Sequence, residues 1–315
     1  MVQVLKKSCD RFKGGELVKI NKIGYLGPKA TFTDLAVTKL FPNDLRQPFY
    51  TIPECIDAVE ADEIEFCVVP LENALEGSVN LTIDYLIHEQ TLPIVGEIAA
   101  PIRQHLMIHR ENTTRWHSIE KVCSHSHAIA QCHKFLQSIV KMAQYEYMTS
   151  TAAAAKYVQE HPEINAAAIA NELAAEEYGL EIVQHDIHDY TNNHTRFVVL
   201  HKGMYELTAE NSMYKGHKTT LMITLPSDNK AGALHQVLSA FAWRKLNLSK
   251  IESRPMKTGL GNYFFIIDIE MKLDQVLIPG AIAELEALGC TVQLLGSYPS
   301  YLIANETMKK SSYKS

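Results

Sequence analysis

The chain has 315 residues, of which 46% are hydrophobic and 21% are charged, and its formal net charge is −6. This length predicts about two domains, and the composition is that of a globular protein with enough apolar residues for more than one core. The acidic balance gives no support to a nucleic-acid-binding protein. The six cysteines have no paired spacing, and the sequence shows neither a signal peptide nor a long apolar span. We therefore expect a cytoplasmic protein with reduced thiols and no membrane association.

The first two thirds of the chain alternate between short apolar runs and segments of helical periodicity. Residues 1–19 are mixed and basic, and we expect an extension to which we assign no function. Strands are expected near 20–26, 65–70, 92–98, 102–108, 118–123, 166–169, 182–187 and 195–200, and helices near 34–41, 52–61, 82–88, 124–140, 151–158 and 171–178. This alternation predicts an α/β domain with a substantially parallel sheet.

Hydroxyl and amide side chains follow several of these strands, where the next helix begins. Helix N-termini favour anions because free backbone N–H groups point outward there, and open α/β sheets bind ligands beyond the carboxyl ends of their strands. We expect Ser124 to cap the helix that reaches about residue 140. The series predicts a shared cleft, and its members are Thr31, Thr33, Asn73, Ser124, Gln131 and Thr151.

Another group of polar residues lies at 192–196, directly before an apolar run. If this segment is extended, Thr195 and Phe197 share one face and Arg196 points away. Arg196 then has two alternative roles, which the sequence leaves open. It contacts a ligand if the preceding turn twists it back, and otherwise it holds the lobes of the domain together. We expect His194 to be a surface histidine.

A group of possible metal ligands follows the strand near 118–123. Its members do not match a standard zinc spacing, and much of the segment is expected to be a helix whose sides diverge. We therefore predict no metal at Cys123, His125, His127, Cys132 and His133.

The last third of the chain has a different organisation. Residues 204–216 lose the periodicity and are expected to form a linker. Strands are then expected at 217–225, 248–256, 262–271 and 291–297, and helices at 232–246 and 275–288. The order βαββαβ within 217–303 is that of a ferredoxin-like unit, which a short tail at 304–315 follows.

Four stretches of the chain resemble the motifs of prephenate dehydratase. They are Gly27-Pro-Lys-Ala-Thr-Phe-Thr33, Val69-Pro-Leu-Glu-Asn-Ala-Leu-Glu-Gly-Ser-Val79, Ser124-His125 through Gln131-Cys132, and Asn193-His-Thr-Arg-Phe197. The chain departs from the family pattern in that Ala30 stands where glycine is usual and Ala74 where a hydroxyl is usual. Ser126-His127 replaces Pro-Gln.

The resemblance implies a two-lobed catalytic domain of the type II periplasmic-binding-protein kind. One lobe comprises about residues 20–98 and 185–203, and the other about 99–184. The implied reaction turns prephenate into phenylpyruvate, water and carbon dioxide in phenylalanine biosynthesis, and it needs no cofactor or metal. Thr195 is the implied catalytic residue, either as part of a proton pathway or as the group that orients the departing oxygen. The resemblance implies that the substrate is surrounded by Asn73, Ser124, Gln131, Thr151, Thr31, Arg196 and Phe197, with Glu72 making a structural hydrogen bond behind the site.

The C-terminal unit resembles an ACT regulatory domain, which implies feedback inhibition by L-phenylalanine and pairing of the domains in a homodimer or homotetramer. The residues implied to bind phenylalanine are Gly232, Ala233, Leu234, Asn247, Leu248, Glu252, Ser253 and Arg254. Two alternatives stay open at this point. One is arogenate dehydratase, which performs the same elimination on the aminated substrate. The other is a binding protein that responds to amino acids without catalysis.

Overall fold

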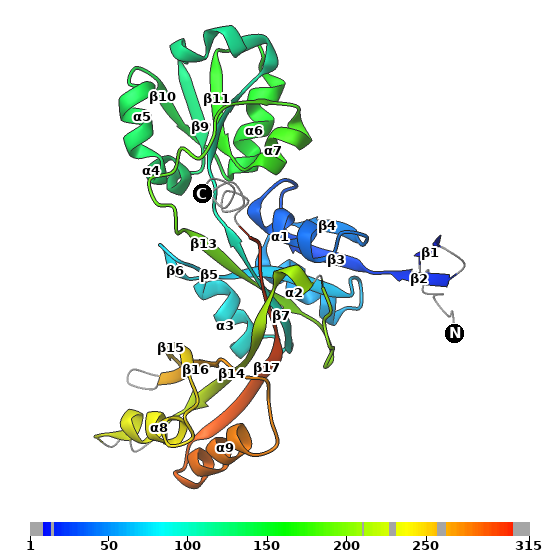
Figure 1. Ribbon diagram of the computed structural model, residues 1–315, viewed down its shortest axis with the longest axis vertical. Helices are drawn as coiled ribbons and strands as arrows, with labels where there is room; N and C mark the ends of the chain where they lie inside the picture. Colours follow the sequence, from blue (N-terminus) through cyan, green and yellow to red (C-terminus); the bar gives the residue numbers. More distant parts are fainter. Residues whose placement is uncertain (1–8, 14–15, 210, 227–230, 257–262, 305–315) are drawn as a thin grey trace, which may run out of the picture.

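The computed structural model describes residues 9–13, 16–209, 211–226, 231–256 and 263–304. Three units follow one another along the long axis of the molecule (Figure 1). We define them by their sheets: the first lobe is residues 22–101 and 194–200, the second lobe is 105–184, and the C-terminal domain is 214–302. In the described part of the chain, no helix has both the length and the apolar character to span a membrane.

The first lobe occupies the middle of the molecule. Its strands are β3 (Lys22–Leu26), β4 (Leu45–Phe49), β5 (Phe66–Asn73), β6 (Gly77–Ser78), β7 (Ile94–Pro101) and β13 (His194–Leu200). Its helices are α1 (Phe32–Leu40), α2 (Ile52–Glu60) and α3 (Asn80–His88). Apolar side chains fill both faces of this sheet, with α1 covering one face and α2 and α3 the other.

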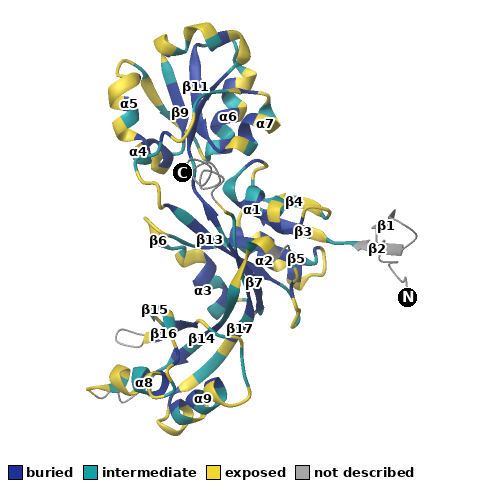
Figure 2. Cartoon of the chain, in the orientation of Figure 1, coloured by how far each residue is buried: buried dark blue, intermediate teal, exposed yellow. Residues whose placement is uncertain are grey.

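The second lobe lies at one end of the molecule (Figure 1). Its strands are β8 (His105–Ile108), β9 (Lys121–Ser124), β10 (Gln144–Tyr147), β11 (Ala166–Ala170) and β12 (Glu181–Gln184). Its helices are α4 (Ser126–Gln131), α5 (His133–Ile139), α6 (Thr151–Glu160), α7 (Glu172–Tyr178) and the 3₁₀ segment η1 (Arg110–Ser118). All five residues of β11 are buried, and their small side chains let helices pack closely on both faces (Figure 2).

Both lobes have mixed sheets, so the prediction of a substantially parallel sheet is correct only in part: among the main described strands, β13 runs against the others in the first lobe and β8 runs against the others in the second. In the first lobe β3 is parallel to β4 and β5, whereas β13 lies between β5 and β7 and is antiparallel to both. In the second lobe β9 is parallel to β10 and β11, whereas β8 is antiparallel to β11 and β12. Strands β8 and β13 lie at the crossings between the lobes, where the chain passes from β7 to β8 and later from β12 to β13. Alternation of strands and helices does not reveal these crossings.

The C-terminal domain has the element order β14 (Tyr214–Thr224), α8 (Ala233–Ala242), β15 (Leu248–Pro255), β16 (Tyr263–Ile269), α9 (Leu277–Ala287) and β17 (Thr291–Leu302). Its strands are antiparallel in the order β15-β16-β14-β17. The end of β17 also pairs in parallel with β7, where Ser300 lies opposite Glu97. The sheets of the C-terminal domain and the first lobe are therefore one continuous sheet of ten strands.

Three further segments differ from the sequence expectations. The N-terminal extension contains a hairpin of β1 (Cys9–Lys13) and β2 (Glu16–Ile20). The expected linker includes the 3₁₀ turn η2 (Asn211–Met213) and the first residues of β14, and its Leu207 is buried against the first lobe. The expected helix near 124–140 is divided at Cys132, and His125 rather than Ser124 is the N-cap of α4.

Candidate active site

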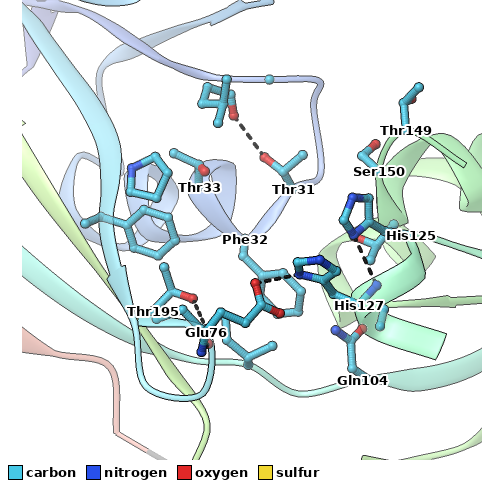
Figure 3. Close-up of a pocket in the computed structure, with 18 of the residues that line it drawn as sticks. Thr31, Phe32, Thr33, Glu76, Gln104, His125, His127, Thr149, Ser150 and Thr195 are labelled. Carbon is cyan, nitrogen blue, oxygen red and sulfur yellow. Dashed lines mark hydrogen bonds and ion pairs between the residues drawn. The ribbon is translucent and has the colours of Figure 1, made fainter. Parts of the chain in front are cut away.

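A cleft of about 420 Å³ lies between the two lobes (Figure 3). Its walls come from the start of α1, the ends of β5 and β13, the start of α4 and the start of α6. The residues that line it are Leu26, Gly27, Thr31, Phe32, Thr33, Tyr50, Pro70, Asn73, Glu76, Ile102, Gln104, His125, His127, Ala128, Gln131, Thr149, Ser150, Thr151, Thr195 and Phe197. The sequence expectation of a shared cleft is thus met by residues from both lobes.

Two of the helix N-termini at this cleft are capped by hydroxyl groups. The Thr31 hydroxyl caps α1 by accepting a hydrogen bond from the Asp34 amide at 3.3 Å, and the Ser150 hydroxyl caps α6 by accepting one from Ala153 at 3.0 Å. Both capping residues line the cleft. Because helix N-termini have a positive potential, the two ends favour an anionic ligand between the lobes. Thr151, a predicted site residue, lies in the first turn of α6 and also lines the cleft.

Thr195 lies at the start of β13, directly opposite Asn73 in the register with β5. Its Oγ1 accepts a hydrogen bond of 2.9 Å from the side-chain amide of Asn73. The Asn73 Oδ1 in turn accepts hydrogen bonds from the backbone amides of Leu75 and Glu76, at 3.0 and 3.1 Å. These two contacts fix the orientation of the Asn73 amide. The Thr195 hydroxyl hydrogen can then point into the cleft, because the Thr195 oxygen is the acceptor in the contact with Asn73.

Apolar groups form part of the cleft wall beside Thr195. Phe197 is only 2% exposed and lines the cleft from the same face of β13 as Thr195, as the strand alternation predicts. Phe32 and Ile102 add further apolar surface. A carboxylate next to this surface has few donors and little water, so the site combines hydrogen-bonding and poorly solvating regions.

Arg196 faces away from the cleft and contacts the C-terminal domain. Its Nη1 donates to Asp268 of β16 at 2.5 Å, its Nη2 to the Tyr298 hydroxyl of β17 at 2.9 Å, and its Nε to Glu97 of β7 at 2.5 Å. It therefore neither reaches the cleft nor holds the two lobes together. The implied role of Arg196 in binding substrate is therefore wrong, and so is the alternative of a clamp between the lobes. The strand alternation points its side chain away from the cleft, toward Asp268, Tyr298 and Glu97.

The surroundings of Arg196 keep it charged in a buried position. Burial opposes the positive charge, but Tyr298, Asp268 and Glu97 together raise the pKa of Arg196 well above its ordinary value. Burial also raises the pKa of Tyr298, which stays a neutral hydroxyl. Lys218 of β14 adds a second cation, 2.7 Å from Glu97. A cluster of buried ion pairs thus joins the first lobe to the C-terminal domain.

The cleft also contains a contact across its two walls that the sequence did not suggest. Glu76, in the turn between β5 and β6, lies 2.6 Å from Nδ1 of His127 on α4. Its other carboxylate oxygen accepts a hydrogen bond of 3.2 Å from Gln131, and the Gln131 side-chain oxygen accepts one of 3.3 Å from Asn193. Glu76 and His127 belong to the motif segments, but only their position in space shows that they meet.

Three other polar residues correct or extend the predicted set. Ser124 is completely buried, and its hydroxyl donates to the Ile169 carbonyl at 2.7 Å, so it supports the lobe from behind the cleft. Gln104 was missed, although it lines the cleft two residues after Ile102. Its buried Oε1 has no hydrogen-bond partner among the described residues. Glu72 also lies behind the cleft, but it forms ion pairs with Lys250 at 3.0 Å and with Arg196 at 3.6 Å.

The possible metal ligands identified in the sequence do not converge. Cys123 and Cys132 are buried in two different cores, whereas His125 and His127 face the cleft. His105, Glu172 and His185 do lie close together, with ligand atoms within 4.8 Å of one another. However, the Asp186 amide donates to Nδ1 of His105, which leaves the proton of the neutral ring on Nε2, the nitrogen nearest Glu172. That proton occupies the position that a metal would need.

The residues implied to bind phenylalanine are divided between two segments of the C-terminal domain. Gly232 has a φ of 88° and precedes α8, in which Ala233 and Leu234 are the first residues. On β15, Glu252 accepts from the Ser78 hydroxyl at 2.5 Å, and Arg254 forms an ion pair of 2.8 Å with Asp84 of α3. Asn247 donates to Glu270, while Leu248 and Ser253 belong to β15. Glu252 and Arg254 therefore connect the C-terminal domain to the first lobe.

Comparison with known proteins identifies relatives along most of the chain. The family model described as prephenate dehydratase matches residues 23–205. Prephenate dehydratase from Bacillus subtilis is 62% identical over 282 residues, which are 89% of this chain and 99% of that protein. The solved prephenate dehydratase of Arthrobacter aurescens in complex with L-Phe is 32% identical, with a TM-score of 0.77 and coverage of 88% of this chain and 89% of that one. The enzyme of Staphylococcus aureus is 33% identical, with a TM-score of 0.74 and coverage of 88% and 99%.

Proposed function

The chain belongs to the prephenate dehydratase family, whose reaction is the decarboxylating dehydration of prephenate to phenylpyruvate, and we propose that this reaction takes place at Thr195. The substrate has two carboxylates and a ring hydroxyl. The hydroxyl leaves as water after it gains a proton, and one carboxylate leaves as carbon dioxide. The electron pair of the broken carbon–carbon bond enters the ring, which becomes aromatic as the carbon–oxygen bond breaks.

The observation that supports Thr195 most strongly is its hydrogen bond from Asn73. A free hydroxyl is a weak acid, and the N–H of Asn73 stabilises negative charge that develops on Oγ1 as its hydrogen moves toward the departing oxygen. A positioned general acid contributes about 10²–10⁴-fold to the rate. In this account Thr195 donates a proton, or shares one, at the leaving oxygen, and Asn73 makes that transfer easier.

Different parts of the cleft suit the two carboxylates. The N-termini of α1 and α6, with the hydroxyl group of Thr151, favour negative charge without fixing it by a lysine or arginine, whereas the Thr31 hydroxyl donates to the Leu26 carbonyl at 3.3 Å. Within the described residues, neither of those residue types lines the cleft. Phe32 and Phe197 provide the poorly solvated surface next to which a carboxylate is less stable and leaves more readily.

We also propose that the two lobes form a type II periplasmic-binding-protein-like catalytic domain and that the C-terminal domain is an ACT domain that binds L-phenylalanine. The βαββαβ order and the segments at Gly232 and Glu252 support this assignment. The relative from Arthrobacter aurescens, solved with L-Phe, supports the choice of ligand. β15 is the terminal strand of the ten-stranded sheet, and such an edge suits pairing with a second copy in a dimer or tetramer.

A direct route links this domain to the catalytic groups. Lys250 of β15 lies 3.0 Å from Glu72 and donates to the Ser78 hydroxyl at 2.9 Å. Glu72 and Ser78 flank the turn that contains Asn73 and Glu76. Phenylalanine that binds one arrangement of β15 better than another would shift this turn, and such differential affinity is what inhibition requires.

The function is tested by phenylpyruvate formation with the purified chain, with and without phenylalanine, and by parallel turnover of arogenate. We expect turnover of prephenate that phenylalanine suppresses. Faster turnover of arogenate would reassign the preferred substrate, and the absence of product from either compound would contradict the proposal.

A further inference from the structure

The contact between Glu76 and α4 has the geometry of a bound carboxylate. His127 and Gln131 are four residues apart on α4, so their side chains project from the same face of the helix. Each contacts a different oxygen of Glu76, His127 at 2.6 Å and Gln131 at 3.2 Å. Figure 3 shows Glu76 extending from the first-lobe side of the pocket to meet His127. A pair of donors on one helix thus binds both oxygens of a single carboxylate.

The charges in the cleft make this pair of donors important for a ligand with two carboxylates. The histidines are the groups in its described lining that become cationic by protonation. Burial, followed by the neighbouring His127, lowers the pKa of His125, which therefore stays neutral near pH 7. The ring of His127 instead contacts the Glu76 carboxylate at 2.6 Å. His127 is consequently the cleft histidine whose ring already binds a carboxylate.

The Glu76 carboxylate is not held firmly in this position. The Glu76 side chain is 41% exposed and that of His127 is 58% exposed, and such exposed ion pairs contribute little stability. Glu76 also lies in the short turn between β5 and β6, next to Gly77, whose φ is 80°. Its backbone amide is bound to Asn73, but its side chain can turn into water without breaking that hydrogen bond.

We propose that His127 and Gln131 form a seat for a substrate carboxylate, and that Glu76 occupies this seat while the cleft is empty. This proposal rests on the proposed function. When substrate binds, its carboxylate replaces that of Glu76, so both donors keep an anionic partner. The seat suits the carboxylate that is retained in phenylpyruvate, because two donors would stabilise the departing carboxylate and oppose its loss. His127 stands where the family motif has glutamine, so this chain places an imidazole donor at that position.

The two members of the ion pair are then expected to have opposite effects when changed. Glu76→Gln removes the competing carboxylate and should lower both the KM for prephenate and the Kd for phenylpyruvate by about threefold or more. His127→Ala should raise both values by about tenfold, because it removes a charge-assisted hydrogen bond. Neither change should alter kcat as strongly as it alters KM. His127→Gln should lie between His127→Ala and the parent, since it keeps a hydrogen-bond donor but not the position of the imidazole nitrogen.

The experiment is steady-state kinetics with prephenate together with calorimetric binding of phenylpyruvate to the full chain. The matched control is His133→Ala, because His133 is an exposed histidine on the adjacent helix α5 and does not line the cleft. If Glu76→Gln weakens the binding of prephenate and phenylpyruvate as much as His127→Ala does, then the Glu76–His127 ion pair persists when the ligand is bound. That result would refute the proposal that the ligand carboxylate replaces Glu76. Unchanged binding in both variants also refutes it. Because phenylpyruvate binding needs no turnover, a failure of the seat is distinguishable from a failure of the proposed function.

Discussion

Thr195 and Arg196 are consecutive residues of β13 that serve opposite sides of the first lobe. Thr195 accepts a hydrogen bond from Asn73 at the cleft, whereas Arg196 donates to Asp268 and Tyr298 of the C-terminal domain. The period of two in a β-strand makes this division unavoidable once the strand is buried on both faces. One short motif thus supplies both a side chain at the cleft and a connection to the C-terminal domain.

The first prediction concerns the stability provided by Arg196. The substitution Arg196→Met removes a cation that both Asp268 and Glu97 contact. These two carboxylates are only 1% and 3% exposed. Removing one partner of a buried pair costs about 3–5 kcal/mol, and we expect a loss of that size in the free energy of unfolding. Urea denaturation measures it. The control is Lys202→Met, which removes a lysine whose ion pairs are exposed and contribute about 0–1 kcal/mol. Equal losses in both variants would contradict the role of the cluster.

The second prediction concerns Asn73 as the partner of Thr195. Asn73→Ala removes the N–H that donates to Thr195 and the oxygen that holds the turn, and we expect kcat to fall by about 10²–10³-fold. Asn73→Asp keeps an acceptor for the amides of Leu75 and Glu76 but removes the N–H. If the donor is the essential feature, the aspartate variant should lose kcat to a similar extent. Recovery of most of the activity in Asn73→Asp would show that the turn, and not the donor, matters.

The third prediction concerns the route from the C-terminal domain to the catalytic turn. Lys250→Met breaks the contacts with Glu72 and Ser78, and we expect the phenylalanine concentration for half-inhibition to rise about fivefold or more. Activity without phenylalanine should change far less. Ser249→Ala is the matched control, because Ser249 is exposed on the same strand. Inhibition that is equally strong in Lys250→Met and the parent would exclude this route.

The fourth prediction follows from His105, which lies beside Asp186 near the crossing between the lobes. Burial lowers the pKa of His105 to about 4, although Asp186 opposes this shift. The ordinary pKa of about 6.5 applies to the unfolded chain, which therefore binds more protons than the folded chain between these two values. The contribution of neutral His105 to the free energy of unfolding is complete above pH 6.5. It is lost as the pH falls toward 4, by up to about 3 kcal/mol. Thermal unfolding from pH 7 to pH 4 should show a shallower decline in His105→Gln, which keeps an acceptor for the Asp186 amide. An identical decline in both proteins would rule out this contribution.

The sequence was informative where function depends on local patterns. Hydroxyl and amide groups at strand ends, together with the motif resemblance, led to Thr31, Asn73 and Thr151, and the motif resemblance led to Thr195; all four line the cleft. The same reasoning failed for Ser124, because its position at a strand end does not reveal that its hydroxyl is used by the carbonyl of a neighbouring strand. Local patterns identify the side of a strand or helix, but not the partner that a neighbouring element supplies.

The contacts between distant segments could not be predicted from the sequence, for a related reason. Arg196 and Asp268 are 72 residues apart, and their pairing depends on the meeting of β17 with β7, which no local periodicity specifies. The contact of Glu76 with His127 likewise requires the two lobes to face each other. The mixed direction of the sheets has the same origin, since it depends on where the chain crosses between lobes.

The proposed reaction depends most on the hydroxyl of Thr195, and the most direct test is kcat for phenylpyruvate formation by Thr195→Val. Valine preserves the branched shape on β13 and removes the hydroxyl, so the fold and the binding of phenylpyruvate should persist. We predict that kcat falls by about 10²–10⁴-fold, while Thr195→Ser, which retains the hydroxyl, keeps most of the activity. A valine variant with kcat within tenfold of the parent would show that Thr195 does not deliver the proton or stabilise the departing oxygen.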